Sequence, residues 1–176
     1  MIEIFLGAVV FLLLAFVFAV VVFIIVPLFY GASYEGSDAR VVKKMVELSK
    51  AKDGEKFADL GSGDGRIVIA FAKSGIEAQG YEINPFLVLF ARRRIKKLGL
   101  EKMAFIHWKN FWKVDLSNFD IVGLFQIGYL MRKIEKKLKS ELRKGSRVVS
   151  NRWGFSNLKI EKQADMGTGV YLYKIR

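Results

Sequence analysis

The N-terminal segment of the chain has no charge over a length that can cross a lipid bilayer. Residues 4–26 number 23, and 19 of them are Leu, Ile, Phe or Val. As a helix rising about 1.5 Å per residue they extend about 34 Å, against roughly 30 Å for the hydrocarbon core of a bilayer. Their composition favours insertion by about 6 to 11 kcal/mol. We therefore predict that residues 1–30 form a transmembrane anchor.

A cleaved secretory signal peptide is the alternative interpretation of this segment. Such a peptide starts with basic residues and has a shorter apolar core, whereas this segment contains Glu3 and no Lys or Arg. The first basic residue is Arg40, followed by Lys43 and Lys44. This excess of basic residues after the span predicts a single-pass protein whose second part, residues 31–176, lies on the cytoplasmic side of the membrane.

The residues after the apolar segment have the composition of one soluble domain. They contain all 29 Lys and Arg and 16 of the 17 Asp and Glu, and the whole chain has one His and no Cys. These counts exclude disulfides, thiolate nucleophiles, Cys-ligated zinc and His-rich sites, so we expect no metal. The positive charge fits solvated helix faces, an anionic membrane surface or a nucleic acid.

Strand and helix patterns alternate through this domain. The predicted strands are residues 56–60, 77–82, 103–108, 119–125, 147–150, 158–164 and 170–175, and the predicted helices are 37–50, 66–73, 85–98 and a Lys-rich segment that ends at Gly145. Such alternation indicates an α/β fold with a mostly parallel, twisted sheet and helices on both faces. The last two strands form a pair at the end of the chain.

Three alternating glycines follow the first predicted strand and precede a helix. Such a turn lets the backbone pass close to a ligand and directs helix N-terminal amides at it. The motif differs from the G-x-G-x-x-G of nicotinamide-binding proteins and lacks the Gly-Lys-Ser/Thr of a P-loop. An acid before the glycines suits a cationic ligand such as S-adenosyl-L-methionine, which carries a sulfonium and an ammonium group. The predicted binding residues are Asp59, Gly61, Ser62, Gly63, Asp64 and Gly65.

Two later segments are candidates for the rest of the same ligand site. Glu82 ends the second predicted strand, 23 residues after Asp59, where a carboxylate can accept both ribose hydroxyls. A solvated acid at a strand end is the alternative. After the third strand, Asn110 offers an amide to an adenine edge and Phe111 offers a ring for stacking, although an aromatic residue there can equally belong to the core. His107 is either a solvated strand end or a contact on the adenine side.

Four segments together resemble the seven-β-strand (class I) S-adenosylmethionine-dependent protein lysine methyltransferases. They are residues 59–70, 80–85, 110–112 and 145–150. The chain is most similar to the membrane-anchored family that includes the mitochondrial enzymes acting on the ATP synthase c-subunit and the adenine nucleotide translocator. Residues 170–174 resemble the ending of small archaeal lysine methyltransferases. The resemblance covers residues 31–176. It implies a Rossmann-like fold, S-adenosyl-L-methionine as cofactor, and methyl transfer to protein lysine side chains.

The chain departs from that family where a parallel sheet presents its substrate. Tyr34 matches the family, but the Pro expected near it is absent, and residues 126–129 and 151–153 differ from the relatives. Methyl transfer needs a neutral amine, and a desolvated, aromatic-lined channel lowers the pKa of a lysine. The predicted catalytic, channel-lining residues are Tyr34, Gln126, Asn151 and Trp153, with ordinary packing or loop polarity as the alternative for each.

Two other functions remain open from the sequence. One is methylation of a lipid-soluble small molecule such as a quinone precursor. The other is methylation or binding of nucleic acid, which the charge favours, although the Asn/Asp-Pro-Pro-Tyr/Phe motif of amino-methylating nucleic-acid enzymes is missing after the fourth strand. The preferred partners are therefore a protein substrate in or near a membrane and membrane lipid, contacted through the N-terminal helix and the basic helices, rather than nucleic acid.

Overall fold

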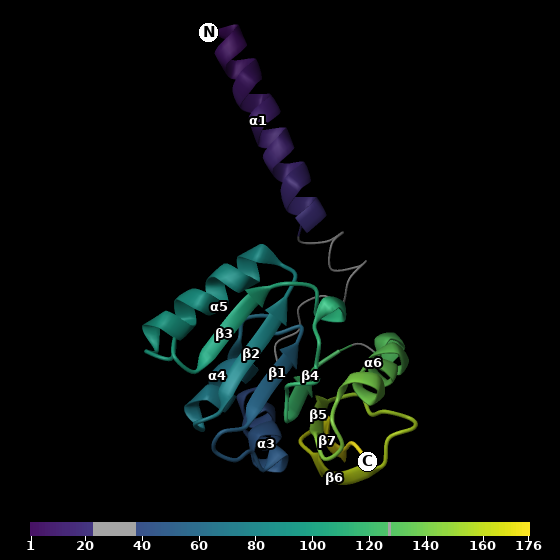
Figure 1. Cartoon of the computed structure of the whole chain (residues 1–176). Helices are drawn as coiled ribbons and strands as arrows, with labels where there is room; N and C mark the ends of the chain where they lie inside the picture. The colour runs from purple at the N-terminus through teal and green to yellow at the C-terminus, as the bar shows by residue number, and fades with distance from the viewer. Residues whose placement is uncertain (23–37, 127) are drawn as a thin grey trace.

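The computed structural model describes residues 1–22, 38–126 and 128–176. Helix α1, Ile2–Val20, is drawn as a separate helix beyond an α/β domain (Figure 1), and none of its side chains is buried. Within the described residues α1 is the one helix long and apolar enough to cross a membrane, a test that signal sequences also pass. Residues 23–30 of the predicted anchor and Tyr34 lie outside the described residues, so the anchor stays a prediction.

The domain is built on one seven-stranded sheet. Its strands are β1 Lys56–Leu60, β2 Glu77–Glu82, β3 Ala104–Trp108, β4 Ile121–Leu124, β5 Arg147–Asn151, β6 Ile160–Asp165 and β7 Gly169–Lys174. The strand order is β3-β2-β1-β4-β5-β7-β6. Strands β1 to β5 pair in parallel, whereas β7 runs antiparallel to both β5 and β6. The predicted parallel sheet with a final strand pair is confirmed.

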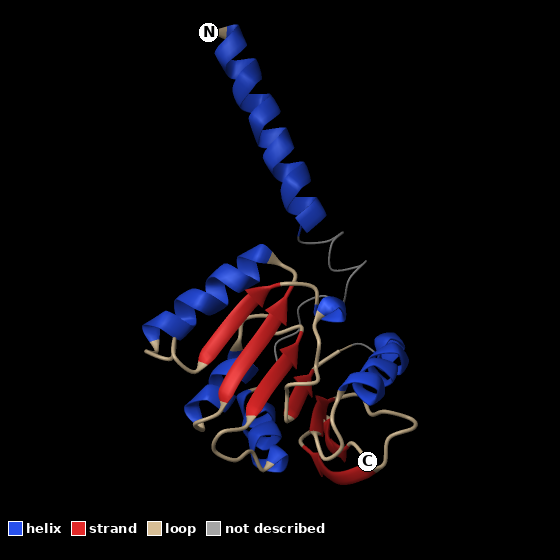
Figure 2. Ribbon diagram, in the orientation of Figure 1, coloured by secondary structure: helices blue, strands red, loops and turns tan. Residues whose placement is uncertain are grey.

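Helices cover both faces of this sheet (Figure 2). They are α3 Ala39–Ser49, α4 Arg66–Lys73, α5 Pro85–Lys97, the 3₁₀ turn η2 Phe111–Lys113 and α6 Gly128–Glu141. Apolar residues of α3, α4 and α5 form one buried cluster with one face of the sheet. Those of α6 and of the segment between β3 and β4 form a second cluster with the other face. Because both faces are covered, β4 is buried throughout and β1 is buried at every position after Lys56.

Local sequence signals set the ends of these elements. Asn84 caps α5, since its side-chain oxygen accepts hydrogen bonds from the backbone N–H groups of residues 86 and 87, and Pro85 occupies the first helical position. Asp38 caps α3 by accepting from the N–H of Arg40. The sequence predicts this helix over residues 37–50, and Ser37, the possible cap at its start, lies outside the described ranges. The difference is one residue, because Asp and Ser are both good caps.

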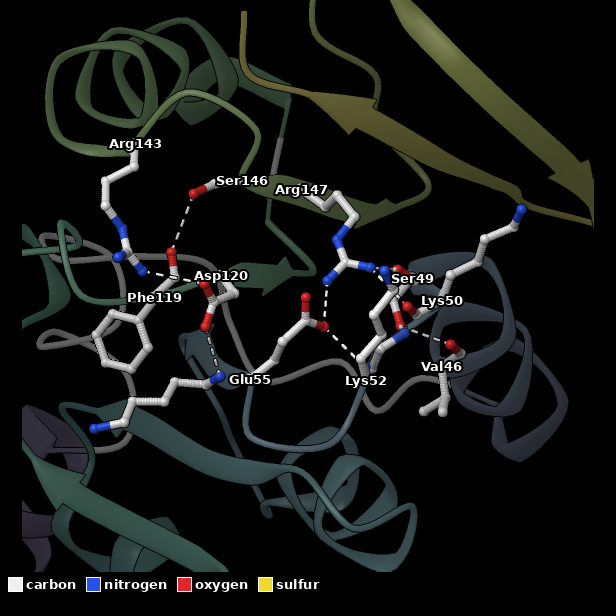
Figure 3. Close-up of polar contacts among 12 residues, drawn as sticks. Val46, Ser49, Lys50, Lys52, Glu55, Phe119, Asp120, Arg143, Ser146 and Arg147 are labelled. Atoms are coloured by element: carbon white, nitrogen blue, oxygen red, sulfur yellow. Dashed lines mark hydrogen bonds and ion pairs between the residues drawn. The ribbon is translucent and has the colours of Figure 1, made fainter.

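A polar clamp at the amino ends of the strands fixes the end of α3 to the sheet (Figure 3). The Arg147 guanidinium, on β5, donates from Nη1 to the carbonyl oxygens of Ser49 and Lys50 at 2.6 and 2.7 Å, and its Nη2 pairs with Glu55. Lys50 has a φ of +48°, which ends the helix in a left-handed residue. This clamp lies at the opposite edge of the sheet from the glycine turn, which follows β1.

Candidate functional site

The glycine turn connects the carboxyl end of β1 to the amino end of α4. Gly61, Gly63 and Gly65 have φ values of +88°, +53° and +76°, a left-handed region that other L residues rarely adopt. The N–H groups of Gly61 and Ser62 donate to the carbonyl oxygen of Tyr81 on β2. A side chain at Gly61 would collide with the Gln126 amide. The turn is therefore held tightly between the ends of β2 and β4.

Glu82 is fixed beside this turn by three backbone amides. Its Oε2 accepts from the N–H of Gly63 at 2.9 Å, and its Oε1 accepts from those of Ile83 and Asn84 at 2.8 Å each. A carboxylate has about four acceptor positions, so this one can still accept hydrogen bonds from a ligand hydroxyl. The side chain is not the freely solvated strand end of the alternative interpretation. Its predicted contact with a ribose stays a prediction.

Asp59 is a buried acid whose charge no described residue pairs. The residue is 1% exposed, and within residues 1–22, 38–126 and 128–176 neither carboxylate oxygen has a hydrogen-bond partner. Burial, followed by the charges of Glu82 and Asp64, raises the pKa of Asp59 to about 8. The nearby Ser62 Oγ is also buried without a partner. Because a buried polar group without a hydrogen bond is costly, these atoms indicate a place where a polar ligand or water belongs.

Asp64 has a different environment. Its carboxylate pairs with Arg66 and Arg94 at 2.9 Å each, which joins the start of α4 to α5. Burial works to raise the pKa of Asp64, but the Arg66 hydrogen bonds and the two cationic charges outweigh it, so this pKa lies below its ordinary value. Its predicted contact with the cofactor stays a prediction, and its observed contacts are structural.

Gln126, Asn151 and Trp153 follow the carboxyl ends of β4 and β5. Gln126 is buried, its Nε2 donates to the carbonyl of Leu60 at 2.7 Å, and its Oε1 has no partner. Asn151 is also buried, and its Oδ1 accepts from the hydroxyl of Thr168 at 3.2 Å. The ring of Trp153 packs against Gly128 at the start of α6. Because neighbouring parallel strands end at one edge, these side chains belong to the same edge as the glycine turn.

In the segment after β3, the two side chains predicted to contact a ligand, Asn110 and Phe111, make contacts within the protein. The Asn110 side chain accepts from the N–H of Trp112 at 3.0 Å, and Phe111 is buried in the cluster that includes Tyr81. The ring of His107 stacks on that of Tyr81 with centroids 5.1 Å apart. Burial, then the charges of Arg92 and Lys109, lower the pKa of His107. Contacts of Asn110 and Phe111 with adenine stay predictions.

Thr168 is a site residue that sequence reasoning missed. It lies in the turn between β6 and β7, and the antiparallel pairing of β5 with β7 brings this turn to Asn151. No local pattern marks Thr168, although its place between Gly167 and Gly169 is typical of a tight turn. Within the described part of the chain, no group of three His, Asp or Glu side chains is arranged to hold a metal ion.

Taken together, the residues converge at a switch point in the sheet. Strand β1 lies between β2 and β4. After β1 the chain continues to β2 on one side, whereas after β4 it continues to β5 on the other side. Open α/β sheets bind ligands in the crevice at such a point. The structure places the glycine turn, Glu82, Gln126 and Asn151 around it, with Asp59 buried beneath.

Comparison with known proteins matches the part of the chain that contains the candidate site. The family model described as the ANTKMT methyltransferase domain matches residues 59–162. The chain is 40% identical over 116 residues to the lysine N-methyltransferase of the ATP synthase c-subunit from Xenopus laevis, covering 66% of this chain and 51% of that protein. It is 41% identical over 129 residues to the adenine nucleotide translocase lysine N-methyltransferase of Mus musculus, covering 73% and 56%. The chain thus spans about half the length of these relatives.

Two further proteins match over most of their own length. The protein-lysine N-methyltransferase of Saccharolobus islandicus is 36% identical over 149 residues, which cover 81% of this chain and 92% of that protein. A crystal structure of an RNA methyltransferase from Salinibacter ruber in complex with S-adenosyl-L-homocysteine has a TM-score of 0.77 and 31% identity, covering 80% of this chain and 94% of that one. The matched family range contains the glycine turn, Glu82, Gln126 and Asn151.

Proposed function

The chain belongs to the ANTKMT methyltransferase domain family, and on this premise we propose that it transfers methyl groups from S-adenosylmethionine to lysine side chains of proteins. Two kinds of relative support the proposal: those from Xenopus laevis and Mus musculus, named for lysine methylation, and the Saccharolobus islandicus protein, matched over 92% of its length. The observation that carries it is the glycine turn, with the unpartnered Asp59 below and the fixed Glu82 beside it.

The residues around the turn fit S-adenosylmethionine. A side chain on Gly61 would collide with the Gln126 amide, so glycine lets the turn and Gln126 lie together at the ends of β1 and β4. The unpartnered carboxyl group of Asp59 suits a ligand ammonium, which would also favour its ionised form. Glu82 has spare acceptor positions for ribose hydroxyls. When bound, the cofactor supplies an electrophilic methyl group on a sulfonium.

The substrate lysine has to reach this site as a neutral amine. With an ordinary pKa of about 10.4, deprotonation at pH 7 costs about 4.6 kcal/mol. The chain can lower this cost by desolvating the amine between Trp153 and the carboxyl ends of β4 and β5. The buried Oε1 of Gln126 can accept a hydrogen bond from the amine and thereby orient its lone pair. The released proton passes to water.

The substrate is proposed to lie in or near the membrane that holds α1. This rests on the length and apolar composition of α1, and on the basic residues that first appear after it. In this arrangement the domain lies on the cytoplasmic side, and the protein crosses the bilayer once. A tethered enzyme meets substrates of its own membrane at a high effective concentration.

RNA methylation is the second candidate function. It is favoured by the Salinibacter ruber structure, which is that of an RNA methyltransferase at 31% identity, and by the formal net charge of +12. Lysine methylation is preferred because several relatives named for it match at 36–41% identity.

One labelling experiment separates these candidates. The full chain is incubated with tritiated S-adenosylmethionine and with membranes and RNA from cells lacking it, and the protein, RNA and lipid fractions are counted. We expect label in protein, recovered as methyl-lysine after hydrolysis, and none with a Gly61→Val chain. Label in RNA would establish the second candidate, and label in lipid would establish methylation of a lipid-soluble molecule.

A further inference from the structure

Exposed apolar side chains of the domain gather at the edge of the sheet that holds the candidate site. Six of them, each between 43% and 67% exposed, follow the carboxyl ends of β2, β3, β4 and β5. We call this set the aromatic rim: Phe86, Leu89, Phe90, Trp108, Tyr129 and Trp153. In the described part of the domain, the other exposed large apolar side chains are Leu98, Phe105 and Ile160, which are 37–42% exposed.

The rim surrounds the candidate site. Strands β3 and β5 are four positions apart in the sheet, which places them about 19 Å apart at roughly 4.8 Å per strand. The α5 residues of the rim lie opposite the buried face of the helix, which consists of Val88, Ala91 and Ile95. Figure 1 shows the start of α5 and the turn η2 at the end of the domain to which the arrows of β2 and β3 point.

The same segments carry positive charge without acids. Residues 83–97, 109–114, 128–134 and 152–157 contain no Asp or Glu. Their ten basic residues are Arg92, Arg93, Arg94, Lys96, Lys97, Lys109, Lys113, Arg132, Lys133 and Arg152. Of these, Arg94 pairs with Asp64 and Lys133 lies over the ring of Trp112. The segments after β3 and β4 therefore bring Lys109, Lys113 and Arg132 near the rim, whereas Arg94, Lys96 and Lys97 lie in the last turn of α5, toward the other end of the sheet.

We propose that the aromatic rim docks the catalytic edge of the domain against an anionic lipid bilayer. Trp and Tyr favour the interface between hydrocarbon and headgroups, and Lys and Arg are attracted to anionic lipid. Exposed aliphatic and phenyl groups such as Leu89 and Phe90 match a bilayer better than the phosphates of a nucleic acid. The docking rests on the proposed function in one respect, namely that methyl transfer occurs at this edge.

Docking would determine which lysines the enzyme reaches. Neither buried cluster of the domain contains a residue of α1, so the anchor alone does not select which face of the domain meets the bilayer. The rim selects one face and closes the site against the headgroups. The substrate class is then a protein lysine at the level of the headgroups, and lysines far from the membrane are poor substrates.

Site-specific labels test this orientation in the full chain. Because the chain has no cysteine, Phe90→Cys and Lys52→Cys each carry a single fluorophore, the first in the rim and the second in the exposed loop before β1. The protein is inserted in nanodiscs of phosphatidylcholine with or without one-third phosphatidylserine, and iodide quenching is measured. In the anionic discs we expect the label at residue 90 to be quenched about fivefold less than the label at residue 52. Equal quenching of both labels in anionic discs would overturn the proposal.

Charge variants provide the matched control. Lys109→Glu/Lys113→Glu changes the charge beside the aromatic rim. Lys52→Glu/Lys102→Glu makes the same charge change at the amino ends of the strands. Each lost basic contact weakens attraction to anionic lipid by about fivefold, so only the first pair should remove the protection of the residue 90 label. An equal effect of both pairs would refute docking by the rim. Protection that persists in detergent and grows with protein concentration would show that a second copy covers the rim.

Cofactor binding keeps the two proposals separable. Binding of S-adenosylhomocysteine, measured by calorimetry, should be the same in the rim charge variant and in the unaltered chain. If protection of the residue 90 label is found but no methyl-lysine is formed, docking stands and lysine methylation fails. If methyl-lysine is formed equally on membrane-embedded and soluble proteins, and the label at residue 90 is unprotected, lysine methylation stands and docking by the rim fails.

Discussion

At the scale of single residues, Glu82 and Asp59 are two acids with opposite surroundings. Glu82 accepts three backbone hydrogen bonds, whereas Asp59 accepts none from the described residues. Burial without hydrogen-bond partners destabilises the ionised form of Asp59. Glu82 is therefore arranged as a fixed acceptor, and Asp59 as a group whose charge depends on a ligand.

The first prediction concerns the charge on Glu82. Glu82→Gln keeps the shape of the side chain but removes the charge, and its amide N–H₂ cannot accept from the turn. Binding of S-adenosylhomocysteine should weaken by about 1.5 to 3 kcal/mol, or roughly 10- to 150-fold, in calorimetry. Transfer at saturating cofactor should change much less, because uniform binding leaves the chemical barrier unaltered. Glu77→Gln, at the other end of β2, is the control, and unchanged affinity in Glu82→Gln would remove Glu82 from the site.

The second prediction concerns the pH dependence of stability from Asp59. Its pKa in the free protein is raised to about 8, so the folded state holds a proton that the unfolded chain releases above about pH 4. This contribution to stability is fully present below pH 4 and is lost as pH rises to 8. The unfolding temperature of Asp59→Asn minus that of the unaltered chain should therefore rise between pH 5 and pH 8 and stay level above pH 8.

The same substitution has a second readout. An ammonium ligand favours ionised Asp59, so S-adenosylhomocysteine should release a proton from the unaltered protein at pH 7, detected by calorimetry in two buffers of different ionisation enthalpy. Asp59→Asn should release none. Proton release of the same size from both proteins would assign the linkage to another group.

At the scale of elements, the glycine turn is a short segment in which other residue types would be strained. Its three φ values are positive, and a side chain at Gly61 would also overlap Gln126. Gly54, in the loop before β1, has a similar φ of +81° but open space around it. Gly54 thus has a φ similar to that of Gly61 but lies away from the candidate site.

The third prediction uses this pair. Gly54→Ala should cost about 1 to 2 kcal/mol of folding free energy through left-handed strain alone and leave cofactor binding intact. Gly61→Ala should cost at least as much and also abolish binding of S-adenosylhomocysteine in calorimetry. Thermal unfolding supplies the stability values. If both substitutions reduce affinity in proportion to lost stability, the glycines serve the fold and not the ligand.

Elements with local signals could be predicted from the sequence, and contacts between distant segments could not. The ranges of β1, α4 and β2 match their predicted bounds, because apolar runs, glycines and caps act over a few residues. The bond between Thr168 and Asn151 depends on the register of β7 against β5. Likewise, Phe111 was weighed as either a ligand contact or a core residue, and only packing shows its burial.

At the scale of the whole molecule, the domain builds its core without α1. Neither buried cluster contains a residue of α1, and no side chain of that helix is buried. The two clusters cover both faces of the sheet with residues from position 41 onward. The core of the domain therefore forms without the helix that is predicted to cross the membrane.

The fourth prediction follows from this separation. A chain shortened to residues 31–176 should be soluble and folded, and should bind S-adenosylhomocysteine within about twofold of the full chain in detergent. Circular dichroism and calorimetry measure the two properties. A folded but non-binding fragment would place part of the cofactor site in residues 1–30, and an unfolded one would show that the domain begins earlier.

The clamp on α3 has a mechanical consequence for a protein tethered by its N-terminus. A pull from the predicted anchor would reach α3 from its N-terminal side, whereas Arg147 holds the far end of that helix through the carbonyl oxygens of Ser49 and Lys50. The clamp thus resists separation of α3 from the sheet at the end of the helix that is farthest from the anchor.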